Sequence, residues 1–293
     1  MKAKPKLSEI IMHGILLLCG LLAVGFLVII TIYLILSGLP AIGKIGIHNF
    51  LFGTEWTPTH ASAPHFGIFS MLLTSLLGTL SAIVIALPIG FFTALFLAKL
   101  APPRIAALIR STIHLLSGIP SVVYGLIGML ILLPSLRTIF HLPAGDTLLA
   151  AVIVLTVMIL PSMITVSETA LRAVPREYEE GSLALGATEL ETYFRISTPA
   201  ASGGLAAGIV LGIGRAIGEA MAIMMVAGNV TNLPSFLKSV RFLTTGIALE
   251  MNYASPGSLQ REALFSIGLV LFVCILLINI LLQWILKGGR KHP

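Results

Sequence analysis

One polar segment interrupts the long apolar stretches of this chain and reads Pro175-Arg-Glu-Tyr-Glu-Glu180-Gly-Ser-Leu-Ala-Leu-Gly186-Ala-Thr188-Glu-Leu-Glu191-Thr-Tyr-Phe-Arg-Ile196-Ser-Thr-Pro199. Pro175 suits the first turn of a helix, where a missing N–H does no harm, and acidic residues follow it near the positive end of that helix. Gly186 can end the helix in a left-handed conformation. Thr188 and Glu191 have the spacing of a capping box for a second helix, which Pro199 bounds. The segment therefore predicts a helix, a glycine turn and a second helix.

The composition around this segment is that of an integral membrane protein. Of the 293 residues, 57% are hydrophobic and 10% are charged, whereas soluble domains carry about 25% charged residues. A membrane-spanning helix needs about 20 apolar residues, and six stretches qualify, near 11–36, 67–98, 111–136, 147–168, 201–229 and 263–286. The alternating pattern of a transmembrane barrel is absent from the sequence. We therefore expect an all-α fold with six transmembrane helices in one domain, residues 11–287.

The basic residues predict how the chain is oriented. One set of loop flanks holds twelve Lys and Arg residues and the opposite set holds five. By the positive-inside rule, the N-terminal segment 1–10, the C-terminal segment 288–293 and the loop 175–199 are expected in the cytoplasm. The basic start and the long apolar run after it, without a convincing cleavage site, indicate a retained first span rather than a signal peptide.

Other readings of the charge and of the histidines are weaker. The net charge of +6 is scattered over short flanks without a basic stripe, so no nucleic-acid partner is expected. The first external loop, 38–66, holds His48, His60 and His65, but their spacing fits no metal template. We expect no metal site and no cofactor.

Prolines interrupt several of the apolar stretches, namely at Pro88, Pro120, Pro134 and Pro161. Each removes a backbone hydrogen bond and bends or breaks a helix. Broken helices around a path are typical of transporters, although a kink that serves packing is an equal alternative at any single proline.

A charged pair lies inside the fifth apolar stretch. Arg215 is about a dozen residues from its cytoplasmic end, roughly 18 Å by helical rise, where an ionised group costs roughly 2.5 kcal/mol or more. Glu219 follows four residues later, on the same face of a continuous helix and within reach of an ion pair. The planar fork of donors on arginine matches phosphate, which favours anion handling; an internal salt bridge that fixes helix packing is the alternative.

The polar segment resembles the EAA loop of ATP-binding-cassette (ABC) importer permeases. The matching residues are Glu180, Gly186, Ile196 and Pro199. The sequence departs from the family pattern at residues 181–182, where Ala-Ala is usual, and at Thr198, where Leu is usual. The resemblance implies that this loop docks into a groove of a separate ATPase subunit and couples ATP hydrolysis to transport.

A second resemblance concerns the fifth stretch, Gly214-Arg-Ala-Ile-Gly-Glu-Ala-Met-Ala-Ile223 with Gly228-Asn229. It is similar to the signature of permease subunits of phosphate ABC importers (Pst systems). Further matching pieces are Phe52-Gly-Thr-Glu-Trp56, Gly118-Ile-Pro-Ser-Val-Val-Tyr-Gly125, Leu243-Thr-Thr-Gly-Ile-Ala-Leu-Glu-Met251 and Arg261-Glu-Ala-Leu-Phe265. These are closer to the PstC-type subunit than to its PstA-type partner, although Gln260 stands where His is expected. The resemblance implies that Arg215 and Glu219 take part in phosphate translocation.

The resemblance also implies a set of partners in a bacterial cytoplasmic (inner) membrane. These are a second homologous permease, two ATPase subunits, the lipid bilayer, phosphate, and an extracytoplasmic phosphate-binding protein that contacts loops 38–66 and 230–262. The chain itself is expected not to be an enzyme, because Gly38 to Lys44 mimics a phosphate-binding loop but Ile45 lacks the hydroxyl that holds magnesium. A permease for molybdate or sulfate remains the alternative, and an anion channel subunit or a membrane-embedded enzyme is less favoured.

Overall fold

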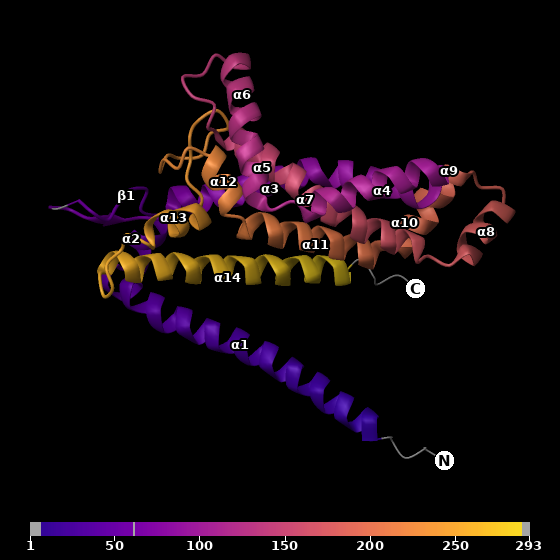
Figure 1. Ribbon diagram of the computed structural model, residues 1–293, viewed down its shortest axis with the longest axis horizontal. Coiled ribbons are helices and arrows are strands. Elements are labelled where there is room, and N and C mark those ends of the chain that lie inside the picture. Colours follow the sequence, from indigo (N-terminus) through magenta and orange to yellow (C-terminus); the bar gives the residue numbers. More distant parts are fainter. Residues whose placement is uncertain (1–6, 61, 289–293) are drawn as a thin grey trace.

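The structure is a computed structural model that describes residues 7–60 and 62–288 (Figure 1). The segments 1–10 and 288–293, for which a cytoplasmic location is expected, fall mostly outside these residues. The described chain is almost wholly helical, apart from a short antiparallel ladder between β1 (Trp56–Thr57) and β2 (His65–Phe66). The all-α expectation is confirmed.

The helices follow one another along the chain, and three π-helical turns extend some of them. The α-helices are α1 (Leu7–Ile45), α2 (Ile47–Phe52), α3 (Phe69–Leu95), α4 (Pro103–Gly118), α5 (Ser121–Ile127), α6 (Leu133–Ile139), α7 (Leu148–Arg172), α8 (Arg176–Ala184), α9 (Glu189–Thr192), α10 (Thr198–Ala200), α11 (Ser202–Gly218), α12 (Met221–Val226), α13 (Leu243–Glu250) and α14 (Leu259–Gly288). The π turns are η1 (Phe96–Leu100), η2 (Gly128–Leu132) and η3 (Tyr193–Ser197).

Within the described residues, five helices are long and apolar enough to cross a membrane. They are Met12–Ile45, Phe69–Leu100, Ser121–Ile139, Leu148–Arg172 and Leu259–Leu282. A sixth crossing is reached if Glu189–Ala200 and Ser202–Gly218, which meet at a bend of 70°, count as one broken span.

Two of the expected spans are divided in the structure, and the first is longer than expected, because α1 continues through Pro40 to Ile45. The stretch 111–136 is divided. Helix α4 ends at Gly118, and the next two residues, Ile119 and Pro120, have an extended backbone. Proline lacks the N–H of a helical bond and disfavours a helical residue before it, so the apolar helix starts only at Ser121. The stretch 201–229 is also divided, at Glu219, where the backbone is extended between α11 and α12.

The other prolines do not divide their helices. Pro134 lies directly after the π turn η2, inside the continuous helix Ser121–Ile139. Pro88 and Pro161 lie inside α3 and α7, which continue through them. Neither of these two prolines breaks its helix, because α3 and α7 pack along each other and hold their backbones in place.

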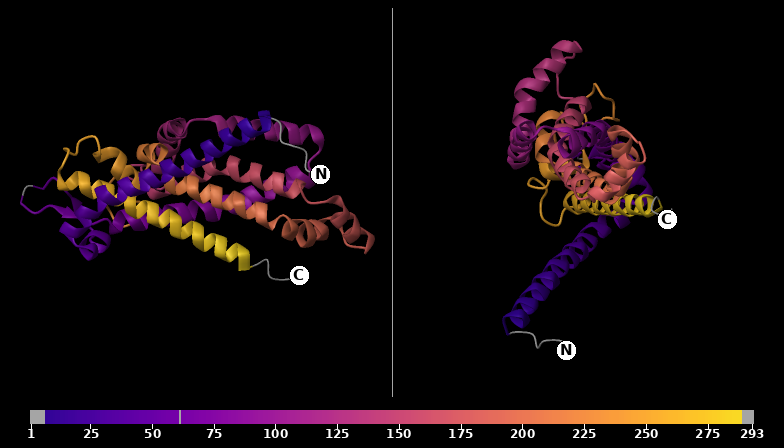
Figure 2. Two further views of the ribbon diagram at one scale, coloured as in Figure 1. Left: turned by 90° about the horizontal axis from the view of Figure 1, so that it is seen from below. Right: turned by 90° about the vertical axis from the view of Figure 1, so that its right-hand side faces the viewer.

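Helix α7 forms the centre of the bundle. Its Leu155, Met158 and Ile159 are fully buried or nearly so, and it packs against α3 on one side and α11 on another. By contrast, α1 leaves the bundle and packs mainly on α14, as the three views show (Figures 1 and 2). The apolar residues of its first half are exposed, which fits a lipid environment.

The bundle has two distinct ends (Figure 1). One, here called the α8 end, carries α8 and α9, and the first turns of α1 and the last turns of α14 point toward it. The other, the hairpin end, carries β1, β2, α2 and α13. The polar segment, the start of α1 and the end of α14 therefore lie on the same side of the bundle, as the six-span expectation requires.

Candidate translocation and coupling sites

Arg215 lies in the last turn of α11 and reaches the middle of α7. Its Nη1 donates a hydrogen bond to Ser162 Oγ at 3.0 Å. Small residues bring the two helices together, because a Cβ on Gly212 would lie 2.9 Å from Met163 Sδ and one on Gly208 would lie 3.1 Å from Ser167 Oγ. The close approach of α11 to α7 thus places the guanidinium group beside the Ser162 hydroxyl.

Glu219 does not form the expected ion pair with Arg215. Among the described residues, no salt bridge joins these two side chains. The helix ends at Gly218, so the geometry of residues four apart on one helical face is lost. Glu219 Oε1 instead accepts a hydrogen bond from the backbone N–H of Ala222 at 2.9 Å, at the start of α12, and its backbone carbonyl accepts one from Thr244 Oγ1 at 2.7 Å.

The half-buried guanidinium group of Arg215 therefore has no carboxylate partner within the described part of the chain. A charge at this depth is costly unless water, a polar group or a ligand surrounds it. Ser162 supplies one neutral acceptor and leaves the other N–H donors of the fork available. This arrangement suits transient binding of an anion.

The polar segment folds locally as expected. Gly186 adopts a φ of +89° after α8, and a complete capping box starts α9. In it, Thr188 Oγ1 accepts from the Glu191 N–H at 3.3 Å while Glu191 Oε2 accepts from the Thr188 N–H at 3.0 Å. Pro199 lies inside α10 instead of ending the helix, and the chain turns at Ala201.

The segment is joined to the bundle by Glu179. Its carboxylate pairs with Lys99 of η1 and accepts a hydrogen bond from Ser197 Oγ at 2.7 Å. Both partners of the ion pair are largely buried. Glu180, the residue expected to act in coupling, is exposed, and Ile196 is only partly buried. Sequence reasoning placed Glu179 merely among the acidic residues of the first turn, because its partner lies 80 positions earlier in the chain.

The segment exposes several large apolar side chains among its charged residues. Leu185 is 91% exposed, and Tyr178, Leu190 and Phe194 are also exposed. Large exposed apolar side chains of this kind mark a candidate surface for contact with another protein.

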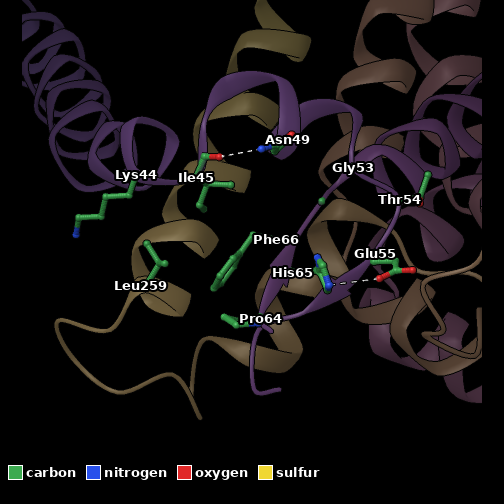
Figure 3. Close-up of a pocket in the computed structure, with 11 residues that line it drawn as sticks. Lys44, Ile45, Asn49, Gly53, Thr54, Glu55, Pro64, His65, Phe66 and Leu259 are labelled. Carbon is green, nitrogen blue, oxygen red and sulfur yellow. Dashed lines mark hydrogen bonds and ion pairs between the residues drawn. The ribbon is translucent and has the colours of Figure 1, made fainter. Parts of the chain in front are cut away.

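At the hairpin end, a cavity of about 550 Å³ lies where the first loop meets the start of α14 (Figure 3). Lys44 and His65 are among the residues that line it. Near its edge, Lys44 pairs with Glu262 at 2.6 Å, which joins α1 to α14. Loop 38–66 thus meets residues of loop 230–262 on this surface, since Leu259 also lines the cavity.

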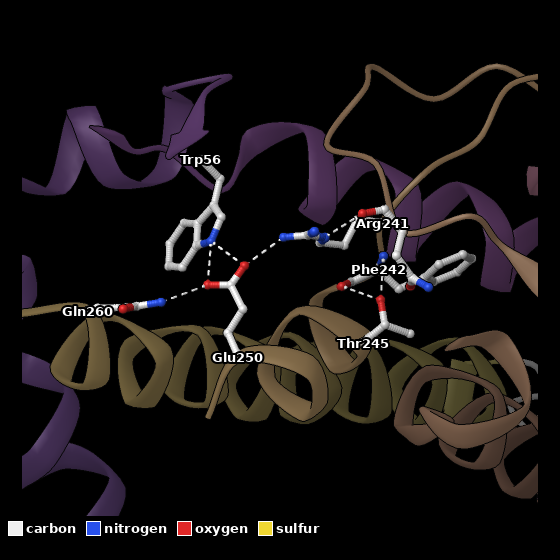
Figure 4. Close-up of polar contacts among 7 residues, drawn as sticks. Trp56, Arg241, Phe242, Thr245, Glu250 and Gln260 are labelled. Atoms are coloured by element: carbon white, nitrogen blue, oxygen red, sulfur yellow. Dashed lines mark hydrogen bonds and ion pairs between the residues drawn. The ribbon is translucent and has the colours of Figure 1, made fainter. Parts of the chain in front are cut away.

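A second feature of the hairpin end was not predicted (Figure 4). The carboxylate of Glu250 accepts hydrogen bonds from Trp56, Arg241 and Gln260. The sequence signal was indirect, because Trp56, Glu250 and Gln260 lie in or beside the matching pieces but are far apart in sequence.

Comparison with known proteins places these features in context. Residues 86–290 match the family model described as binding-protein-dependent transport system inner membrane component. The chain is 38% identical to the probable ABC transporter permease protein YqgH of Bacillus subtilis, over 98% of this chain and 93% of that protein. It is 34% identical to the phosphate transport system permease protein PstC of Haemophilus influenzae, over 90% of this chain and 88% of that protein.

Solved structures share the fold. A chain of the inward-facing MetNI methionine ABC transporter superposes with a TM-score of 0.57 at 20% identity, covering 77% of this chain and 95% of that one. A crystal structure of an amino acid ABC transporter with histidines gives a TM-score of 0.52 at 18% identity, covering 75% of this chain and 93% of that one. At these identities the likeness concerns the arrangement of helices alone.

Proposed function

The chain belongs to the family of binding-protein-dependent transport system inner membrane components, and we propose that it moves inorganic phosphate through the membrane as the permease subunit of an ABC importer. It is a multi-pass membrane protein that supplies a pore, while a separate subunit hydrolyses ATP. The proposal of phosphate draws on the relatives that carry this substrate in their names.

The observation that carries the proposal is Arg215. It is a permanent charge in an apolar helix, bonded to a neutral hydroxyl and free of any carboxylate partner in the described chain. A guanidinium group offers a flat array of donors that fits a tetrahedral oxyanion. Glu219, at the adjoining helix break, fixes the start of α12 and keeps that break in place.

The partners follow from the family and from the two ends of the bundle. A second, homologous permease completes the pore, and one of the two ATPases contacts the exposed apolar side chains of α8 and α9. A phosphate-binding protein delivers phosphate at the hairpin end, on loops 38–66 and 230–262. In this orientation the α8 end and both chain termini face the cytoplasm of a bacterium, as the distribution of Lys and Arg indicates.

The contacts of Glu179 suggest how force reaches the pore. Closure of the ATPases would displace α8, and the ion pair between Glu179 and Lys99 would carry this motion to η1. Because η1 continues α3 and α3 packs on α7, the motion reaches the helix that holds Ser162 against Arg215.

The test is uptake by the complete complex in proteoliposomes. ATP is enclosed in the vesicles, and the binding protein is added to the outside. Radiolabelled phosphate should accumulate, and excess unlabelled phosphate should compete with it while sulfate and molybdate should not. Equal competition by sulfate or molybdate would assign another oxyanion. Uptake that proceeds without ATP would instead favour an anion channel.

A further inference from the structure

Three charged side chains meet between α4 and α7, on the α8 side of Arg215. Arg110 Nε donates a hydrogen bond to Glu168 Oε1 at 2.7 Å, and Arg172 Nε forms an ion pair with the same oxygen at 3.0 Å. The Nη2 atoms of both arginines donate to the backbone carbonyl of Leu97, at 3.1 Å and 3.4 Å. Two cations thus share one carboxylate and one carbonyl.

The charges in this cluster do not cancel. Glu168 is buried, and one arginine would suffice to neutralise it. The second arginine leaves an excess of one positive charge. Each guanidinium group has five N–H donors, and the hydrogen bonds above use two on Arg110 and one on Arg172, so the Nη1 atoms of both side chains keep free donors in the described structure.

A cavity of about 270 Å³ adjoins the cluster. The polar residues that line it are Arg110, His114, Thr165, Glu168, Thr169 and Arg172. Its volume is far above the roughly 10–15 Å³ that one water needs. The Thr165 and Thr169 hydroxyls donate to backbone carbonyls one turn earlier, at 2.8 Å each, so the two arginines and the His114 ring supply the donors for a ligand.

One face of α7 connects this cavity to Arg215. Ser162, which holds Arg215, is followed by Thr165, Thr169 and Arg172 at spacings of three, four and three residues. Such spacings place side chains on one helical face. Ten residues of helix separate Ser162 from Arg172, which corresponds to about 15 Å. None of these four residues is fully buried in the chain.

We propose that Arg110 and Arg172 form a second oxyanion site, which binds the phosphate group of an anion on the α8 side of Arg215. If the proposed function holds, on which this site rests, the two arginines bind the phosphate that Arg215 releases toward the cytoplasm. Glu168 holds both arginines in place, and its negative charge lowers their affinity for the anion. The anion can therefore leave, as conduction through successive sites requires. The same donors suit the phosphate of an anionic lipid headgroup, and the experiment separates the two sources.

The first variant is Arg172→Gln, because it leaves the shorter Arg110–Glu168 pair intact. Uptake by the complete complex should fall about tenfold, the effect of losing one charged hydrogen-bond donor. The matched control is Arg104→Gln on the exposed side of α4, which removes the same charge outside the cavity and should take up phosphate at the wild-type rate. Thermal unfolding of both complexes in detergent shows whether either variant is less stable.

A second variant tests whether the cluster binds an anion or only fixes the packing of α4 on α7. Glu168→Gln removes the negative charge, so a binding site should hold phosphate more tightly, with a lower KM and a slower maximal rate of uptake. If the cluster only fixes packing, Glu168→Gln should lower the stability of the complex and should not lower the KM of phosphate uptake. Unchanged KM in Glu168→Gln, together with wild-type uptake in Arg172→Gln, would overturn the inference even though the wild-type complex transports phosphate.

To test a lipid headgroup as the ligand, phosphate uptake by wild type and by Arg172→Gln is compared in two kinds of vesicle. One contains phosphatidylcholine alone, and the other also contains phosphatidylglycerol. Transported phosphate as the ligand predicts the same tenfold difference between wild type and Arg172→Gln in both. A lipid headgroup as the ligand predicts that the difference disappears in phosphatidylcholine. If the wild-type complex takes up no phosphate in either vesicle, the proposed function fails, and not this site alone.

Discussion

The indole nitrogen of Trp56 donates hydrogen bonds to both carboxylate oxygens of Glu250, each at 2.9 Å, across 194 positions of the sequence. Arg241 Nη1 donates to Oε1 of the same carboxylate at 2.7 Å, and Gln260 Nε2 donates to Oε2 at 3.1 Å. The β hairpin, α13 and the start of α14 therefore depend on one largely buried acid. Because these segments form the surface assigned to the binding protein, Glu250 sets the position of that surface.

Replacement of Glu250 by alanine should destabilise the hairpin end. It leaves the Arg241 charge without its partner, which costs roughly 3 kcal/mol of unfolding free energy at a buried site. In a Trp284→Phe background, the fluorescence of Trp56 should shift to longer wavelength, because water reaches its buried indole when the hairpin end loosens. Glu55→Ala is the control, since Glu55 is mostly exposed and only its 3.8 Å contact with His65 is lost. An unshifted spectrum with unchanged stability would contradict the role of Glu250.

Substitution of Arg215 tests the translocation role. Arg215→Gln keeps a polar side chain that can bond to Ser162 but removes the charge, so phosphate uptake should fall at least tenfold. Arg215→Lys should retain part of the uptake, because the charge stays and the planar fork is lost. Uptake is measured on complexes whose subunit content has been verified by purification. Wild-type uptake in Arg215→Gln would remove Arg215 from the path.

Glu219 offers a sharper comparison, because the structure gives it a capping bond where the sequence suggested an ion pair. Glu219→Gln keeps an oxygen that can accept from the Ala222 N–H, whereas Glu219→Ala leaves that N–H without an acceptor. If Glu219 acts mainly as a cap, uptake should persist in Glu219→Gln and fall in Glu219→Ala. The fall should correspond to the loss of one helix cap, about 1 kcal/mol. Equal loss in both variants would instead assign the role to the negative charge.

The sidedness of the two bundle ends can be tested by labelling. In a chain whose Cys19 and Cys274 are replaced by serine, Leu185→Cys and Tyr253→Cys each introduce one thiol at a residue that is almost fully exposed, 91% and 87% respectively. A membrane-impermeant maleimide added to intact cells should label the variant at position 253 and spare the one at 185. The reverse result would place the α8 end outside and would contradict docking of an ATPase there.

The sequence predicted features that depend on neighbours within a few residues. The left-handed Gly186 and the capping box of Thr188 and Glu191 are examples, because both form within one helical turn. The prediction of an ion pair between Arg215 and Glu219 was wrong, because the rule for residues four apart assumes an unbroken helix. The break at Glu219 is held by Thr244, whose hydroxyl bonds to the Glu219 carbonyl from 25 positions away.

The missed residues have distant partners. Arg110 and Glu168 are 58 positions apart and Trp56 and Glu250 are 194 apart. In the sequence each reads as an isolated polar residue at the edge of an apolar stretch. Only the packing of α4 on α7, and of the hairpin on α13, brings their polar groups together, and no local pattern of a single sequence encodes that packing.

A comparison of two glycines in the polar segment tests coupling. Gly186 has a φ of +89°, and no atom lies within 4 Å of the place that a methyl group would take, so Gly186→Ala strains the backbone alone, by about 1–2 kcal/mol. Gly181 also has open space around it but lies within α8 without a positive φ, so Gly181→Ala adds the same methyl group without strain. Because the turn at Gly186 sets the angle between α8 and α9, Gly186→Ala should lower the phosphate moved per ATP hydrolysed several-fold, while Gly181→Ala should not. Uptake and ATP hydrolysis are measured on the same proteoliposomes. Identical ratios in both variants would show that the glycine turn does not transmit the motion of the ATPases.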